Sequence, residues 1–261
     1  MSILLLDSGV GGLTVLKVLR AALPRQRYIF VADNAAFPYG AWDEDALRNH
    51  IVALFHRLVA EYSPDLAVIA CNTASTLVLP ALRGTFAIPF VGTVPAIKPA
   101  AEATKSGLVS VLATPGTVKR DYTKALIRDF ANGCEVTLVG CTALAGIAEA
   151  KLSGGKVDAD ALAAEIAPAF VEKGDKRTDT IVLGCTHYPL LLDELAEVAP
   201  WKVDFIDPAP AIARRVRQVL PESIPSGGGG DVAHFTDGGN LSEDLLRVMA
   251  QFRLKIGQAD M

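Results

Sequence analysis

Short apolar runs alternate with longer amphipathic segments along the chain. The runs are rich in leucine, isoleucine and valine, as buried strands are, and lie at residues 3–6, 28–31, 66–70, 90–91, 108–112, 136–139, 181–183 and 203–206. The segments between the first runs predict helices at residues 13–22, 44–62 and 74–83. Strands that alternate with helices predict βαβ units, so we expect an α/β fold of mainly parallel sheets flanked by helices.

Proline pairs mark two places where the chain is expected to pass between two lobes. They are Pro95 with Pro99, and Pro208 with Pro210. The first lobe would comprise residues 1–94 plus 209–261, and the second lobe residues 95–208. Ser226 and Gly227–Gly230 predict an exposed loop, because serine and glycine runs punctuate regular structure.

A faint internal repeat agrees with this division. The first strand of each half ends in small residues, Asp7-Ser8-Gly9 in one and Ala113-Thr114-Pro115-Gly116 in the other. Each half later carries a cysteine directly after an apolar run. The repeat therefore predicts two similar lobes that face each other, with equivalent groups on opposite sides of one cleft.

The two cysteines in matching positions are the strongest chemical signal. Cys71-Asn72-Thr73 follows the run at 66–70, and Cys185-Thr186-His187 follows the run at 180–184. Open α/β sheets build their sites beyond the carboxyl ends of parallel strands. Two thiols placed in this way predict one site with two similar sulfur groups, which suits a reaction that acts on both faces of its substrate.

Composition limits the classes of function. The chain has 261 residues, of which 51% are hydrophobic and 21% charged, enough for a folded core. A net charge of −4 gives no basic surface for nucleic acid, and no apolar run is long enough to cross a membrane. The apolar start of the chain meets Asp7 at once, which predicts a first strand and no signal peptide. Four cysteines without a framework spacing predict free thiols in the cytoplasm.

The glycine-rich turn at residues 9–14 allows two interpretations. It follows a strand, precedes a helix and, with Asp33 after the second strand, resembles a dinucleotide fingerprint. Thr14 stands where the third glycine belongs, however, and the charge of Asp7 would oppose a pyrophosphate. We therefore favour a tight turn whose backbone N–H groups, with Ser8, hold a small anion.

The remaining candidates have weaker settings. A histidine two residues after Cys185 can lower a thiol pKa or relay its proton, although His187 could also cap a helix. Pro38-Tyr39-Gly40 predicts a rigid turn that presents a hydroxyl and a free amide. Glu149 either faces the cleft or is solvated. We interpret the others as structural or surface residues without a zinc-binding spacing: Cys134, Cys141, His50, His56 and His234.

Together these motifs resemble glutamate racemases, the cofactor-independent members of the aspartate/glutamate racemase superfamily. The likeness covers nearly the whole chain, and its combination of motifs is specific. It rests on Asp7-Ser8-Gly9-Val10-Gly11-Gly12-Leu13, Asp33-Asn34, Phe37-Pro38-Tyr39-Gly40, Ala70-Cys71-Asn72-Thr73-Ala74, Ala113-Thr114-Pro115-Gly116-Thr117 and Gly184-Cys185-Thr186-His187-Tyr188-Pro189-Leu190.

The resemblance implies a role for each matching residue. Cys71 and Cys185 would be the two acid/base thiols, Asp7 and His187 would each assist the nearer thiol, and Glu149 would be the matching acid of the second lobe. The substrate would be lined by Asp7, Ser8, Tyr39, Gly40, Asn72, Thr73, Thr114, Thr117, Thr186 and His187. The family commonly has Cys-Pro where this chain has Cys141-Thr142, which weakens the transfer of the role to Glu149.

The same resemblance implies the reaction. Cys71 would abstract the Cα proton from D-glutamate and Cys185 from L-glutamate, without cofactor or metal, and D-glutamate would supply peptidoglycan synthesis. It also implies a cytoplasmic homodimer that binds neither nucleic acid nor membrane. Alternatives are an aspartate or hydantoin racemase on the same thiols, a nucleotide-dependent dehydrogenase on the glycine turn, and a non-catalytic protein that binds a small acid.

Overall fold

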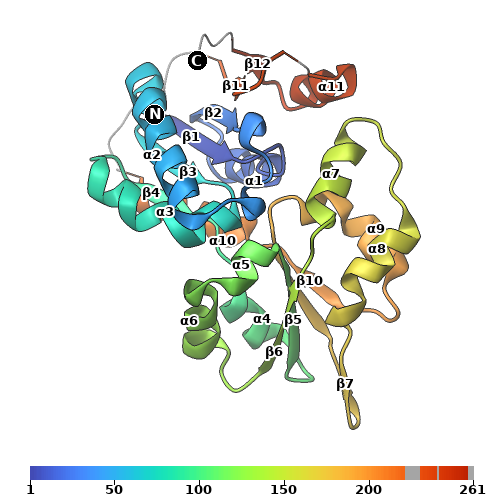
Figure 1. The fold of residues 1–261 in the computed structure, drawn as a ribbon. Helices are drawn as coiled ribbons and strands as arrows, with labels where there is room; N and C mark the ends of the chain where they lie inside the picture. Colours follow the sequence, from blue (N-terminus) through green and yellow to red (C-terminus); the bar gives the residue numbers. More distant parts are fainter. Residues whose placement is uncertain (221–229, 240, 258–261) are drawn as a thin grey trace.

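The protein folds around two parallel sheets (Figure 1). The computed structural model describes residues 1–220, 230–239 and 241–257. The larger sheet has the order β12-β11-β2-β1-β3-β4, and each pair of neighbours is parallel. Its strands are β1 (Ser2–Asp7), β2 (Arg27–Ala32), β3 (Leu66–Ile69), β4 (Phe90–Gly92), β11 (Val232–Phe235) and β12 (Lys255–Ile256).

The second sheet has the order β10-β9-β5-β6 and is also parallel. Its strands are β5 (Leu108–Ala113), β6 (Glu135–Gly140), β9 (Thr180–Gly184) and β10 (Asp204–Ile206). A short antiparallel hairpin of β7 (Glu172–Lys173) and β8 (Lys176–Arg177) was not predicted from the sequence, because its two-residue strands carry no apolar pattern. The predicted α/β class with parallel sheets is confirmed.

Helices cover the sheets on both faces (Figure 1). Around the larger sheet lie α1 (Leu13–Ala22), α2 (Glu44–Tyr62), α3 (Asn72–Thr85), α10 (Ala209–Val219) and α11 (Glu243–Gln251). Around the smaller sheet lie α4 (Ile97–Ala103), α5 (Pro115–Lys119), α6 (Asp121–Phe130), α7 (Leu144–Leu152), α8 (Ala159–Ile166) and α9 (Leu192–Val198). Short 3₁₀ turns are η1 (Asn34–Ala36), η2 (Tyr39–Ala41), η3 (Ala167–Ala169) and η4 (Tyr188–Leu191).

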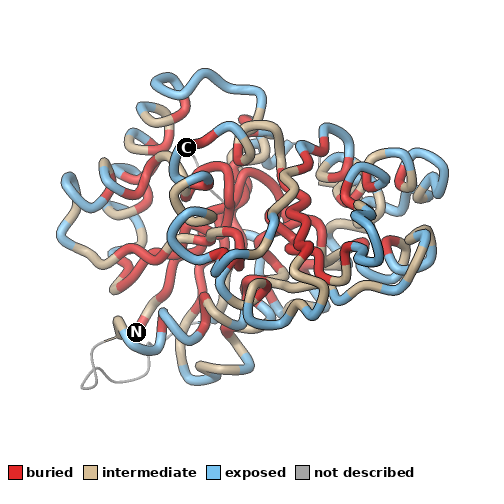
Figure 2. Tube along the Cα trace, turned by 90° about the horizontal axis from the view of Figure 1, so that it is seen from below, coloured by how far each residue is buried: buried red, intermediate tan, exposed pale blue. Residues whose placement is uncertain are grey.

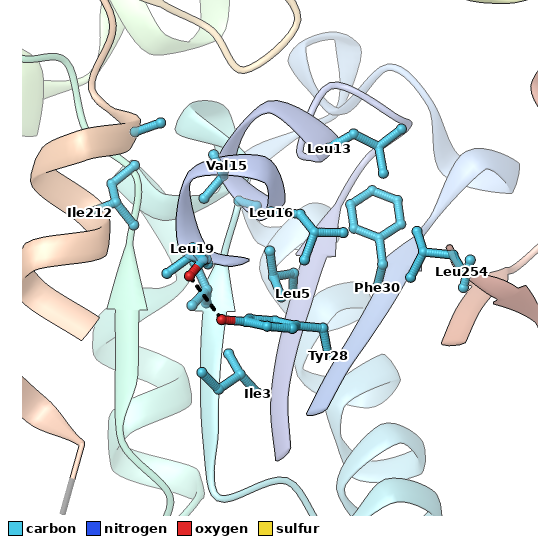
Figure 3. Close-up of a cluster of buried hydrophobic side chains, with 14 of the residues drawn as sticks. Ile3, Leu5, Leu13, Val15, Leu16, Leu19, Tyr28, Phe30, Ile212 and Leu254 are labelled. Carbon is cyan, nitrogen blue, oxygen red and sulfur yellow. Dashed lines mark hydrogen bonds between the residues drawn. The ribbon is translucent and has the colours of Figure 1, made fainter. Parts of the chain in front are cut away.

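The alternation of side chains along β1 explains why its whole run is apolar. Ile3 and Leu5 pack beneath α1 and α10, where the Tyr28 hydroxyl donates to the Leu19 carbonyl at 3.0 Å (Figure 3). Leu4 and Leu6 point to the opposite face, beneath α2 and α3. A strand buried on both faces needs apolar residues at every position. The strands accordingly form the buried centre of the molecule (Figure 2).

The two crossings between the sheets lie side by side. One joins β4 to α4 and the other joins β10 to α10. A cavity of about 270 Å³ is lined by Pro95, Pro99 and Pro208, from both crossings. Of the predicted loop at 226–230, residues 226–229 lie outside the described residues. No helix within the described ranges is long and apolar enough to span a membrane.

Candidate active site

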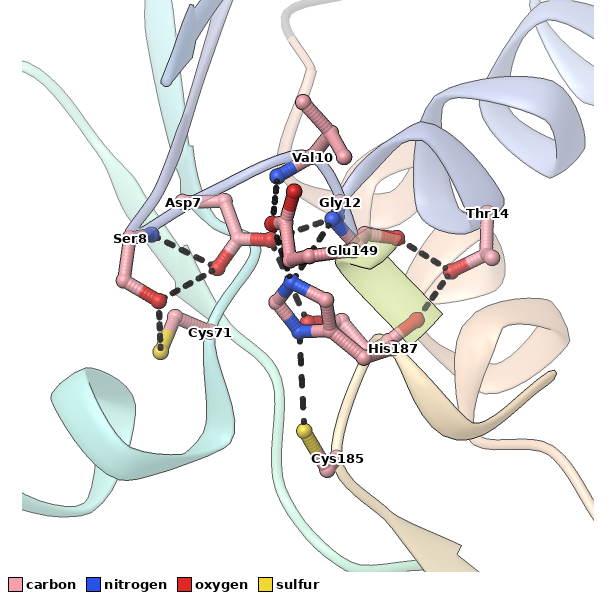
Figure 4. A network of polar contacts seen from close by, with 11 residues as sticks. Asp7, Ser8, Val10, Gly12, Thr14, Cys71, Glu149, Cys185 and His187 are labelled. Carbon is pink, nitrogen blue, oxygen red and sulfur yellow. Dashed lines mark hydrogen bonds and ion pairs between the residues drawn. The ribbon is translucent and has the colours of Figure 1, made fainter. Parts of the chain in front are cut away.

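Cys71 and Cys185 occupy equivalent places in the two sheets. Cys71 comes two residues after β3 ends and stands at the N-cap of α3, which begins at Asn72, two residues before the predicted start. Cys185 directly follows β9. Both thiols are buried, with 6% and 7% of their surface exposed. Figure 4 shows them on segments of the two different sheets, beside one network of polar contacts.

The carboxylate of Asp7 lies at the centre of this network. It accepts from the Ser8 amide at 2.7 Å, the Gly12 amide at 2.5 Å and the Thr186 hydroxyl at 3.3 Å. Burial raises the pKa of Asp7, whereas the charge of His187 and the Gly12 and Ser8 amides lower it; the net shift is upward. Part of the anion-holding capacity predicted for the glycine turn thus serves the protein's own carboxylate.

Glu149 uses another amide of the same turn. Its Oε1 accepts from the Val10 amide at 2.7 Å and lies 2.8 Å from His187 Nε2 (Figure 4). A Cβ on Gly9 would lie 2.0 Å from this oxygen, and a Cβ on Gly11 would lie 2.4 Å from His187 Nδ1. The two glycines therefore let the second sheet's side chains approach the backbone, which explains them without a nucleotide.

His187 connects Glu149 to Cys185. Its side chain is buried, and its Nδ1 lies 3.7 Å from the Cys185 sulfur. Burial by itself would lower the pKa of His187, but hydrogen bonds to Cys185 and Glu149 and the charge of Asp7 raise it well above its ordinary value. The Gly11 amide donates to His187 Nε2 at 3.2 Å in the neutral form, whereas a protonated His187 can donate to a thiolate from Nδ1 and to the Glu149 carboxylate from Nε2.

Cys71 has a different neighbour. The Ser8 hydroxyl lies 3.9 Å from its sulfur and 3.5 Å from Asp7 Oδ1, so Asp7 reaches Cys71 through Ser8 (Figure 4). Burial raises the pKa of the Cys71 thiol well above its ordinary value, and the negative charge of Asp7 adds to this shift. At neutral pH Cys71 is therefore a thiol in this arrangement.

Three threonine hydroxyls meet between the two sheets. Thr73 Oγ1 lies 2.7 Å from Thr114 Oγ1 and 3.3 Å from Thr117 Oγ1, and the latter two are 3.1 Å apart. Beside Thr73, both polar atoms of the Asn72 side chain are buried and make no protein hydrogen bond within the described chain. Because a buried amide is costly to leave unpaired, Asn72 is suited to a polar ligand.

Asp33 does not have the surroundings that a ribose-binding acid needs. It is 1% exposed, and its carboxylate accepts from the Tyr39 hydroxyl at 2.5 Å and the Thr236 hydroxyl at 2.8 Å. The third partner is His50, whose Nε2 lies 2.6 Å from Asp33 Oδ2. The interpretation of His50 as a helix-surface residue therefore missed this contact, although 29% of its side chain is exposed. Its helical spacing from the buried Leu47 and Leu54 was the signal that could have revealed this contact.

The other two cysteines make different hydrogen bonds, although Cys141 belongs to the same buried cluster as Cys185. Cys141 Sγ contacts the Glu165 carbonyl at 3.7 Å, and burial raises the pKa of Cys141 to about 12. Cys134 Sγ contacts the Ala101 carbonyl at 3.8 Å. Within residues 1–220, 230–239 and 241–257, no group of three His, Cys, Asp or Glu side chains could hold a metal ion.

Comparison with known proteins places this geometry in a family. Residues 13–216 match the model of the Asp/Glu/Hydantoin racemase family. The chain is 58% identical to a glutamate racemase of Mesorhizobium japonicum over 97% of its length and 98% of that protein. It is 60% identical to one of Brucella ovis over 84% of its length and 79% of that protein.

A solved structure agrees with these relatives. Escherichia coli glutamate racemase, in complex with L-glutamate and the activator UDP-MurNAc-ala, superposes with a TM-score of 0.91 at 43% identity, over 98% of this chain and 96% of that one. The resemblance found in the sequence is confirmed by all three comparisons. The chain therefore belongs to the Asp/Glu/Hydantoin racemase family of isomerases, on the branch of the glutamate racemases.

Proposed function

We propose that the protein interconverts L- and D-glutamate by exchanging the proton at Cα between Cys71 and Cys185. One observation carries the proposal: two buried thiols follow equivalent strands of two sheets and share one polar network. Racemisation breaks the Cα–H bond on one face of the amino acid and returns a proton to the opposite face of the planar carbanion. Two thiols on opposite sides can serve both faces, which one base cannot easily do.

In the L-to-D direction, the Cys185 thiolate removes the Cα proton and the Cys71 thiol returns a proton to the opposite face. The products are D-glutamate, a Cys185 thiol and a Cys71 thiolate, so atoms and charge balance. The reverse direction exchanges the two roles. The raised pKa values of Cys71 and His187 support this starting state, with a thiol at Cys71 and an imidazolium beside Cys185.

The Cα proton is much less acidic than a thiol, so the site must stabilise the carbanion. Preorganised donors in a water-excluded site are the means that enzymes use most. We propose that the unpaired amide of Asn72 and the hydroxyls of Thr73, Thr114 and Thr117 bind the carboxylates of glutamate. The other proposed lining residues are Asp7, Ser8, Tyr39, Gly40, Thr186 and His187.

We further propose that two lobes close over the substrate. The first lobe comprises residues 1–94 with 209–261, and the second comprises residues 95–208. The adjacent crossings support this idea, because two neighbouring connections can act as one hinge. From the family resemblance we also propose a cytoplasmic homodimer that takes only a small-molecule substrate and supplies D-glutamate for peptidoglycan synthesis. The E. coli relative has an activator, UDP-MurNAc-ala, and we propose that this ligand be tested here.

The decisive experiment is incubation of the pure protein with L-glutamate in D₂O, with no added cofactor. We expect the circular dichroism signal of glutamate to decay to zero while deuterium enters at Cα. L-aspartate and a hydantoin in parallel reactions test the alternatives within the family. Loss of optical activity only with another substrate, or no deuterium uptake from glutamate, would refute the proposed function.

A further inference from the structure

The buried carboxylate of Asp33 is a second polar centre outside the thiol network. It accepts hydrogen bonds from three side chains: Tyr39 Oη at 2.5 Å, His50 Nε2 at 2.6 Å and Thr236 Oγ1 at 2.8 Å. An ionised carboxylate only accepts, so the His50 nitrogen that faces it carries the proton. Asp33 thereby joins the end of β2, the turn η2, the helix α2 and the segment after β11.

Tyr39 connects this centre to the region of Cys71. Its side chain is 1% exposed and belongs to the same buried cluster as Cys71. Burial and then the charge of Asp33 raise the pKa of Tyr39 well above its ordinary value, and the charges of Cys71 and Asp7 add to this. The phenol is therefore protonated, and its turn η2 packs against helix α3, at whose N-cap Cys71 stands.

The residue after Tyr39 reaches the other side of the site. A Cβ on Gly40 would lie 3.5 Å from the Thr114 Cβ, and one on Gly116 would lie 3.5 Å from the Gly40 Cα. The turn η2 thus lies between the Cys71 region and the loop after β5. Any shift of Tyr39 would move a segment that touches both sides of the proposed substrate site.

A phenol has one O–H group, and in this structure the O–H of Tyr39 donates its hydrogen bond to Asp33. We propose that Asp33 is a positioning residue for racemisation: it fixes Tyr39 in the buried cluster that contains Cys71 and accepts the hydrogen bond of its only O–H, so that the phenol cannot donate to a thiolate at Cys71. His50 and Thr236 hold Asp33 in place for this task. The inference rests on the proposed function, since it assigns Cys71 a thiolate stage.

A double-mutant cycle tests whether Asp33 acts through the Tyr39 hydroxyl. Asp33→Asn should lower kcat about tenfold with a smaller change in KM, and Asp45→Asn, at an exposed acid of α2, should change neither. In a Tyr39→Phe background, Asp33→Asn should have no further effect on kcat. If the two losses multiply instead, Asp33 acts independently of the hydroxyl and the proposal is wrong.

A second readout does not require racemisation. Alkylation of each thiol by iodoacetamide can be followed by mass spectrometry, and Asp33→Asn should change the Cys71 rate at least about threefold while the Cys185 rate stays the same. The Tyr39→Phe background should abolish that change. An unchanged Cys71 rate, or an equal change at both thiols, would overturn the proposal whether or not glutamate is the substrate.

If Asp33→Asn does not fold, Thr236→Val takes its place. This change removes one donor to Asp33 and leaves Tyr39 intact. The same two measurements then apply, with a smaller expected loss that also disappears in the Tyr39→Phe background. A loss that persists there would contradict the proposal.

Discussion

The two thiols stand in equivalent places, but the polar groups behind them differ. The Ser8 hydroxyl contacts Cys71, and the Asp7 carboxylate contacts that hydroxyl. The His187 imidazole contacts Cys185, and the Glu149 carboxylate contacts that imidazole. A protonated imidazole offers a thiolate a positive charge, whereas a hydroxyl offers only a dipole. The repeated architecture therefore places the two sulfurs alike and leaves them chemically unequal.

The two carboxylates also differ in the group of the other sheet that each one contacts. Asp7, from the first sheet, accepts from the Thr186 hydroxyl at 3.3 Å. Glu149, from the second sheet's helix α7, accepts from the Val10 amide at 2.7 Å. Each carboxylate thus accepts a hydrogen bond from a segment of the other sheet.

The largest effect is expected at the thiols themselves. Cys71→Ser and Cys185→Ser should each lower kcat by roughly 10²–10⁴-fold, because a hydroxyl is a much weaker acid than a thiol. Thermal unfolding should show that both variants fold. Cys134→Ser, at a partly buried sulfur whose hydrogen bond is to the Ala101 carbonyl, is the matched control and should keep full activity. A Cys71→Ser variant with nearly normal turnover would refute the two-thiol mechanism.

The next effect concerns the contact between the glycine turn of the first sheet and Glu149 of the second sheet's helix α7. Gly9→Ala would place a Cβ 2.0 Å from Glu149 Oε1, so the Glu149 carboxylate, which contacts His187, must shift. Misplacement on this scale can cost about 10²-fold in kcat. Gly84→Ala is the control, because a Cβ there meets nothing within 4 Å in helix α3. Steady-state kinetics should separate the two variants; equal activity would mean that the close approach is dispensable.

A smaller effect, dependent on pH, is expected from Glu149→Gln. Glu149 is one of the groups that raise the pKa of His187, so its loss should lower that pKa. With L-glutamate as substrate, kcat should then begin to fall at a lower pH in the variant, because His187 loses its proton earlier as pH rises. At neutral pH we expect a loss of about tenfold, the value of one charge-assisted hydrogen bond.

The control for this profile is Glu197→Gln, which removes a carboxylate from the exposed surface of α9. Its pH dependence should coincide with that of the unmodified protein. A Glu149→Gln profile that also coincides would show that Glu149 does not govern the protonation of His187.

The smallest and sharpest effect separates the two directions of the reaction. A racemase has an equilibrium constant of one, so His187→Asn must lower kcat/KM equally for both enantiomers. The asymmetry can appear in primary isotope effects with Cα-deuterated substrates. Since His187 contacts Cys185, the isotope effect should change more with L-glutamate than with D-glutamate. Equal changes would indicate that His187 only positions the substrate.

Much of the fold could be predicted because its signals are local. The apolar runs before Cys71 and Cys185 are buried strands, and α1 and α2 have the predicted bounds. Cys71 and Cys185 could be paired from sequence because each follows an apolar run in one of two repeated halves, and open α/β sheets build their sites beyond the carboxyl ends of such strands. The resemblance then extended the prediction to the family. None of these inferences required knowing which distant segments touch.

What the sequence by itself determined was thus the class of fold, the two thiols and the family. Only the tertiary structure decided the partners of each charge. Val10 and Glu149 are 139 positions apart, and no periodicity reports that a backbone amide will meet that carboxylate. The same holds for Asp33, which stands where a ribose-binding acid would in a fingerprint that the sequence itself disfavoured; only the structure showed that His50 and Tyr39 contact it. Such contacts depend on how separate helices and strands pack, because burial leaves each polar group only the partners that packing brings within reach.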